Sequence, residues 1–248
     1  MSAGIVHIGV AGARGRMGRA VQEALDQRED ALVAVRFDRG DEPDLAACDV
    51  VIDFTTAEAS AALAERAAGV RRPALVIGST GFDPVQRKAV EQAAKSVPIV
   101  FSGNFSLGVN VLIGLVAQAA ARLGPQDWDI EIFEAHHRRK ADAPSGTALM
   151  LGEAAAWARG GDLEGLRDHQ RNGITGPREA GRIGFSVLRG GGIVGDHAVT
   201  FAAEDEVLTL SHSARDRSLF ARGAVEAALW VKGRPPGLYD MQDVLGFK

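Results

Sequence analysis

The chain has a single cysteine, Cys48, among its 248 residues. An intrachain disulfide is therefore excluded, and a reducing compartment such as the cytoplasm is expected. Segment 1–15 lacks a basic stretch followed by an apolar one, which predicts no secretory signal. No apolar run approaches the roughly 18 residues that span a bilayer, so no membrane partner is expected.

Basic residues show no excess either, since 28 Lys and Arg against 32 Asp and Glu give a formal net charge of −4. This balance argues against a dedicated nucleic-acid-binding protein. Apolar residues make up 46% of the chain and charged residues 24%, which excludes disorder. At this length we expect one large domain or two of ordinary size.

The N-terminal part alternates short apolar runs with segments of helical periodicity. Strands are predicted at 5–13, 31–37, 49–54, 73–77 and 98–101, with helices between them at 16–28, 57–68 and 84–95. Buried strands separated by helices are typical of βαβ units. An α/β fold with a parallel sheet and helices on both faces is therefore predicted.

After Asn104 the pattern changes, which predicts a domain boundary there. Helices are predicted at 109–123, 145–159 and 218–232, and strands at 129–133, 183–188, 193–201 and 206–212. The last three strands are separated by turns of hairpin length and predict an antiparallel meander. The second domain is therefore expected to be smaller and α+β, with a mixed or antiparallel sheet.

A glycine-rich turn joins the first predicted strand to the first helix. Gly12, Gly15 and Gly18 recur every third residue, a variant of the spacing that brings backbone N–H groups and a helix N-terminus to a pyrophosphate. At the end of the second strand, Asp38 could accept from ribose hydroxyls, whereas Arg39 could pair with a 2′-phosphate. The alternative is an ordinary turn with an exposed charged pair, and this context favours a dinucleotide.

Loops 78–81 and 102–105 also follow predicted strands and would share that sheet edge. The richest chemistry lies in 134–147, with two histidines, three fixed cations, two carboxylates and a helix N-terminus. Pro144 disfavours helix before it, so 137–143 is predicted to be a loop. Such a site suits a polyanionic small molecule, held by Lys140 and the N–H groups of Gly146 and Thr147.

A solvated basic patch, a nucleic-acid contact and a metal site are the alternatives for this segment. The acidic chain and the lack of interleaved aromatics disfavour nucleic acid, and the histidine spacing and missing cysteines disfavour zinc, so no metal is expected. Cys48 is interpreted as a packed residue. The remaining histidines are interpreted as strand or surface residues: His7, His169, His197 and His212.

Four segments together resemble the dihydrodipicolinate reductase family, also called 4-hydroxy-tetrahydrodipicolinate reductases, of lysine and diaminopimelate synthesis. They are GARGRMG at 12–18, GSTGF at 78–82, NFSLGVN at 104–110 and EAHHRRKADAPSGT at 134–147. The resemblance extends from about residue 5 to Leu245, and the last segment is the most specific. It implies NADH- or NADPH-dependent reduction of 4-hydroxy-tetrahydrodipicolinate to tetrahydrodipicolinate.

The resemblance implies a Rossmann-like dinucleotide-binding domain at 1–105 and 217–248. It implies a substrate-binding domain at 106–216, through whose sheet a homotetramer assembles. His136 corresponds to the proton donor or acceptor, Lys140 to a proton donor, and His137, Gly146 and Thr147 to substrate contacts. The implied cofactor contacts are Gly12, Ala13, Arg14, Gly15, Arg16, Met17, Asp38, Arg39, Gly78, Ser79, Thr80, Ser102, Gly103, Asn104 and Phe105.

Two departures from the family pattern leave the choice between NADH and NADPH open: Asp38 stands where Glu is common, and segment 40–48 is short. Two other functions remain as alternatives. A different Rossmann-fold oxidoreductase of a small dicarboxylate, such as a semialdehyde dehydrogenase, would need a nucleophilic cysteine, for which Cys48 is misplaced. A non-catalytic NAD(P)-sensing protein would have no need of His136 and Lys140 together.

Overall fold

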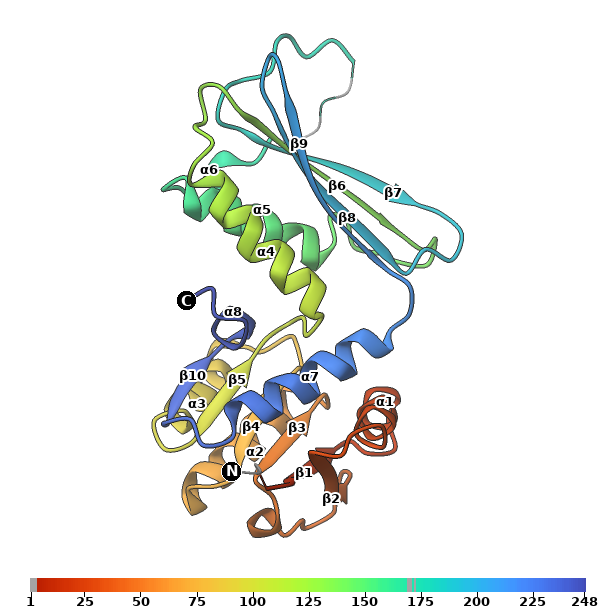
Figure 1. Cartoon of the computed structure of the whole chain (residues 1–248), viewed down its shortest axis with the longest axis vertical. Helices are drawn as coiled ribbons and strands as arrows, with labels where there is room; N and C mark the ends of the chain where they lie inside the picture. Colours follow the sequence, from red (N-terminus) through yellow and green to blue (C-terminus); the bar gives the residue numbers. More distant parts are fainter. Residues whose placement is uncertain (1–3, 169–170, 172) are drawn as a thin grey trace. The chain divides into compact units, whose positions relative to one another are not determined.

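A computed structural model describes residues 4–168, 171 and 173–248 of the chain, and His169 lies outside the described residues. The chain divides into two compact units, Met1–Leu107 with Ser218–Lys248, and Gly108–Arg217. The sequence predicted domain boundaries after residues 105 and 216, and the two units divide after Leu107 and Arg217. Each unit contains its own sheet and its own helices (Figure 1).

In its described part, the first unit contains a six-stranded sheet in the order β10-β5-β4-β3-β1-β2, with all neighbours parallel. The strands are β1 (Val6–Ala11), β2 (Ala31–Phe37), β3 (Val50–Asp53), β4 (Ala74–Ile77), β5 (Pro98–Phe101) and β10 (Gly237–Tyr239). The predicted parallel sheet is confirmed, although β10 was missed because it has three residues. Because β2 and β3 flank β1, the strand order reverses there, where folds of this kind bind ligands.

Helices cover both faces of this sheet (Figure 1). One face packs against α1 (Arg16–Leu25) and α7 (Ser218–Val231), the other against α2 (Ala57–Val70) and α3 (Pro84–Ala93). Small residues let α7 approach closely, since a Cβ at Gly223 would collide with the carbonyl oxygen of Phe105. Two short helices complete the unit: the 3-10 turn η1 (Leu45–Ala47) and α8 (Met241–Val244).

The second unit has a four-stranded mixed sheet in the order β7-β6-β8-β9. Its strands are β6 (Asp129–His136), β7 (Ile183–Arg189), β8 (Gly195–Ala202) and β9 (Val207–Ala214). The predicted meander is wrong in one half, because β7 pairs in parallel with β6 while β8 pairs antiparallel on its other side. The turn after β7 passes around the end of β6, where Gly190 N–H donates to the His136 carbonyl at 2.9 Å.

One face of the mixed sheet packs against α4 (Leu107–Ala120), α5 (Gly146–Ala158) and α6 (Leu163–Leu166). Buried and part-buried residues alternate along β8, as expected of a strand with one covered face. Within the described residues no helix covers the opposite face, where the side chains of Phe133 and Leu188 are exposed. Across the described chain, none of the helices has the length and apolar character to cross a membrane.

Candidate active site

A pocket of about 400 Å³ lies in the first unit beside the ends of β1, β2 and β3. Gly12, Asp38 and Arg39, all singled out in the sequence, line it together with Asp53 and Thr55. Asp53 accepts from the Thr55 backbone N–H at 2.8 Å and from its hydroxyl at 2.6 Å, which holds the loop after β3 in its turn. Carboxylates and hydroxyls at this strand edge suit the ribose of a nucleotide.

The glycine turn forms the backbone cradle that a pyrophosphate needs. Gly12 has a φ of +67°, where a side chain would be strained, and its carbonyl accepts from Gly15 N–H at 2.9 Å. Gly15 precedes α1 without a side chain to cap it, so the positive helix end faces the turn. A Cβ at Gly18 would strike the Gly12 carbonyl, which allows α1 to pack against the turn. The residues therefore fit a dinucleotide.

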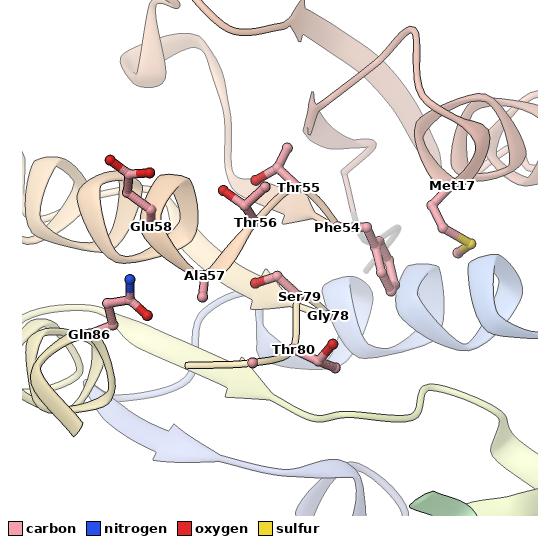
Figure 2. A pocket seen from close by; sticks show the side chains of 11 residues that line it. Met17, Phe54, Thr55, Thr56, Ala57, Glu58, Gly78, Ser79, Thr80 and Gln86 are labelled. Atoms are coloured by element: carbon pink, nitrogen blue, oxygen red, sulfur yellow. The ribbon is translucent and has the colours of Figure 1, made fainter. Parts of the chain in front are cut away.

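A second pocket of about 540 Å³ in the same unit extends from this edge (Figure 2). Met17 from α1 and Gly78, Ser79 and Thr80 after β4 line it, as do several residues missed from the sequence. The missed residues follow β3: Phe54, Thr55, Thr56, Ala57 and Glu58. Their signal was available, because they follow the carboxyl end of a predicted strand as the glycine loops do.

The other predicted cofactor contacts lie outside the walls of these two pockets. Arg14 instead pairs with Asp38 in the wall of the first pocket, its Nε lying 3.5 Å from Oδ2. In the loop after β5, Ser102 donates to the Asn104 carbonyl at 2.8 Å, and Phe105 is 1% exposed with its ring 5.6 Å from that of Phe54. Ser102, Asn104 and Phe105 are buried, whereas Gly103 between them is exposed.

In the second unit the conspicuous polar segment begins within β6. The sequence predicted this strand to end at Phe133, but it continues to His136 because β7 and β8 pair with it on both sides. Glu134 and His136, two apart on one strand, therefore share a face. Beyond the strand, Lys140 N–H donates to the His137 carbonyl at 3.1 Å, and the Lys140 ammonium lies 2.9 Å from Asp142.

Glu134 is fully buried at the centre of this cluster. Within the described residues it accepts two hydrogen bonds at 2.8 Å from the Arg189 guanidinium, one at 3.0 Å from Ser145 N–H, and one at 2.6 Å from Nδ1 of His136. Burial raises the pKa of this carboxyl, but the hydrogen bonds from Arg189, His136 and Ser145 outweigh it and hold the pKa below its usual range. Glu134 is thus ionised at neutral pH.

Two further histidines adjoin the cluster and are kept neutral. Desolvation, and then the cations Arg139 and Arg217, lower the pKa of His137, whose Nδ1 has no partner within the described residues. Burial lowers the pKa of His197 to about 4, and its Nε2 lies 3.2 Å from the Ser145 hydroxyl. As expected, His7, His197 and His212 lie on strands.

The segment ends at the N-terminus of α5, which Ser145 caps by accepting from Ala148 N–H at 3.2 Å. Gly146 and Thr147 occupy the first turn, where backbone N–H groups and the helix dipole attract anions. Lys140 and this helix end bracket the loop, so the cluster presents an ammonium, two neutral or protonatable imidazoles and an anion-attracting helix terminus. This is a donor set for a dicarboxylate.

Cys48 is 1% exposed, and burial raises its pKa to about 11, so it does not serve as a nucleophile. The described residues contain no group of three or more His, Cys, Asp or Glu that could hold a metal ion.

Both parts of the chain are similar to known proteins. The family models for the N-terminus and the C-terminus of dihydrodipicolinate reductase match residues 6–105 and 108–245. The chain belongs to the dihydrodipicolinate reductase family. Members of this family named 4-hydroxy-tetrahydrodipicolinate reductase from Caulobacter vibrioides and Zymomonas mobilis are 66% and 51% identical, over 98% and 97% of both chains.

A dipicolinate-bound dihydrodipicolinate reductase from Paenisporosarcina sp. TG-14 shares the fold with a TM-score of 0.79, 21% identity and coverage of 96% of this chain and 99% of that one. The chain is accordingly an NAD(P)H-dependent oxidoreductase. It reduces 4-hydroxy-tetrahydrodipicolinate to tetrahydrodipicolinate in diaminopimelate and lysine synthesis.

Proposed function

We propose that the two units divide the reduction between them, the first holding the nicotinamide cofactor and the second holding and protonating the substrate. The observation that carries this assignment is the buried Glu134 cluster. It brings together, in one unit, His136, the loop 137–143 that carries Lys140 (the Lys140 loop) and the N-terminus of α5. The glycine cradle lies in the other unit.

A bound nicotinamide cofactor supplies the hydride. The first unit orients it, with the turn from Gly12 to Met17 on the pyrophosphate and the loops after β3 and β4 along the second pocket. Asp38 and Arg39 both line the pocket of about 400 Å³ beside the ends of β1, β2 and β3, so we propose that both NADH and NADPH are used. Asp38 accepts from ribose hydroxyls, and Arg39 pairs with a 2′-phosphate.

In the second unit, the substrate carboxylates bind where positive charge and N–H groups converge. Lys140 and the N–H groups of Gly146 and Thr147 hold them, and the neutral His137 is a further contact. The structurally similar enzyme named above binds dipicolinate, a planar dicarboxylate, which supports a site of this kind.

Reduction of a conjugated imine leaves electron density that must receive a proton, which is general-acid work. Lys140 donates this proton; its side chain is 22% exposed, and its ammonium pairs with Asp142. His136 shares or relays the proton from its Nε2, because its Nδ1 faces Glu134. The loop 102–105 contacts the cofactor through its exposed residue, Gly103.

We also propose that the chain works in the cytoplasm as a homotetramer assembled through the uncovered face of the mixed sheet. Exposed Phe133 and Leu188 on that face support this assembly, because burying large apolar side chains favours association. Sedimentation of the purified chain tests it, and a monomer at micromolar concentration would contradict it.

The central test follows NADH and NADPH absorbance while substrate is made from pyruvate and aspartate semialdehyde. We expect oxidation of both cofactors that depends on this substrate and competitive inhibition by dipicolinate. Changing Thr147 to Val should weaken that inhibition. Turnover that persists when aspartate semialdehyde is replaced by unrelated carbonyl compounds, or no effect of dipicolinate, would contradict the assignment.

A further inference from the structure

Glu134 contributes no surface to the site, yet it contacts three parts of it. Its carboxylate binds His136 on its own strand, Ser145 at the start of α5, and Arg189 at the end of β7. Arg189 in turn donates to the Asp142 carbonyl at 2.7 Å, in the loop that carries Lys140. One buried side chain therefore connects the residues proposed for proton transfer with those proposed for substrate carboxylate binding.

The contact with His136 determines which of its ring nitrogens carries the hydrogen. An ionised carboxylate only accepts hydrogen bonds, so Nδ1 of His136, 2.6 Å away, must be the donor. In the neutral ring Nε2 is then bare and accepts a proton, and in the cation it holds one to give. Without this contact the two tautomers would compete.

The surroundings of the ring hold it in this orientation. The His197 ring meets that of His136 edge-on with centroids 5.1 Å apart, and a Cβ at Gly195 would lie 3.0 Å from the His136 Nε2. Gly195 therefore leaves the space beside the nitrogen that the chemistry uses. Arg189 keeps the carboxylate ionised despite complete burial, because two charge-assisted hydrogen bonds offset its desolvation.

We propose that Glu134, with Arg189, is a positioning residue for the reduction: it holds His136 as the Nδ1–H tautomer with Nε2 toward the substrate, and it sets the Lys140 loop against the start of α5. The proposal rests on the assigned role of His136. Glu134 itself touches neither substrate nor cofactor.

The first test needs no substitution at Glu134. In the full-length wild-type enzyme with 15N-labelled histidine rings, the neutral His136 ring should show a protonated Nδ1 and a bare Nε2, its signals assigned by their loss in His136→Gln. A neutral ring protonated at Nε2 would overturn the proposal. The NMR signals report the tautomer whether or not His136 takes part in turnover. Full activity of His136→Gln would therefore refute the catalytic role of His136 without deciding its tautomer.

The second test is Glu134→Gln, with Glu131→Gln as the matched control. Glu131 lies on the same strand and also binds arginines, at 3.0 Å to Arg178, but on the opposite face. We expect Glu134→Gln to lower kcat by at least about tenfold, but by less than the roughly 10²–10⁴-fold lost when a general acid is removed. KM should change less than kcat, and the His136 ring should become a mixture of its two tautomers. The control should keep kcat within about twofold.

Glu134→Asp distinguishes positioning from simple loss of folding. It retains the charge, so partial recovery of kcat together with the Nδ1–H signal supports the proposal. A folded Glu134→Gln enzyme with wild-type kcat, or equal losses in Glu134→Gln and Glu131→Gln, would overturn it.

Discussion

The two units build their sites in different ways. In the first, the glycine turn offers backbone groups beside the two pockets, because Gly12 and Gly15 carry no side chain and Gly18 lets α1 pack against the turn. In the second, the polar cluster consists of side chains and a helix end, held by hydrogen bonds to the buried Glu134. A cofactor that only needs to be held can be bound by backbone groups, whereas proton transfer needs titratable side chains at controlled positions.

The comparison predicts that removing a functional side chain from the second unit impairs chemistry and spares nucleotide binding. Lys140→Ala and His136→Gln should each lower kcat by about 10²–10⁴-fold, the usual loss of a general acid. Lys140→Ala should also raise KM, because a carboxylate partner is lost. Steady-state kinetics and nucleotide titrations measure both.

The double variant should be little worse than the more damaged single one, as expected for residues that act as a unit. Strictly multiplicative losses would show that Lys140 and His136 act independently. Weakened nucleotide binding in either single variant would break the division between the units.

The buried His197 of the second unit predicts a loss of stability between pH 7 and 5. The pKa of His197, lowered by burial to about 4 from its usual 6.5, means that the unfolded chain binds the proton first. The contribution of neutral His197 to the free energy of unfolding is therefore complete above pH 6.5. It is lost as the pH falls toward 4, by about 3 kcal/mol in total.

Urea unfolding between pH 7 and 5 measures this loss, of which about 2 kcal/mol should appear by pH 5. In His197→Gln the dependence should be smaller, whatever the absolute stability of the variant. If the free energy of unfolding of His197→Gln falls as steeply with pH as that of the wild type, another group, such as His212, causes the pH dependence.

In the first unit, the corresponding change adds a side chain. Gly15→Val should weaken binding of both NADH and NADPH by tenfold or more, at least about 1.4 kcal/mol, because the new methyl groups occupy the approach to the helix end. Gly69→Ala is the control, since a Cβ there meets nothing within 4 Å. Calorimetric titration measures the affinities, and a folded Gly15→Val chain with normal affinity would contradict the cradle.

The smallest expected effect concerns the choice of cofactor. We expect NADH and NADPH affinities to differ by less than about tenfold, because Asp38 and Arg39 favour opposite cofactors. Arg39→Ala should lower NADPH affinity more than NADH affinity in the same titration. Equal losses would mean that Arg39 is structural.

Much of the fold could be predicted from local pattern. The strands at 31–37 and 98–101 have the predicted bounds, and α1, α2 and α3 begin at the predicted residues, because alternating periodicity and glycine turns are short-range signals. The position of β6 between β7 and β8 could not be predicted. Turn length does not reveal which strand lies between two others, and the five residues after Arg189 pass around the end of β6.

By itself the sequence determined the parallel α/β unit, the glycine turn and the polar segment 134–147, since each depends on residues close together in the chain. Only the tertiary structure decided what Glu134 contacts and that Phe105 turns into the core. Arg189 and His197 reach the cluster from 55 and 63 residues beyond Glu134, brought there by strand pairing. Burial and ionisation of a carboxylate depend on such distant partners, which no local pattern contains.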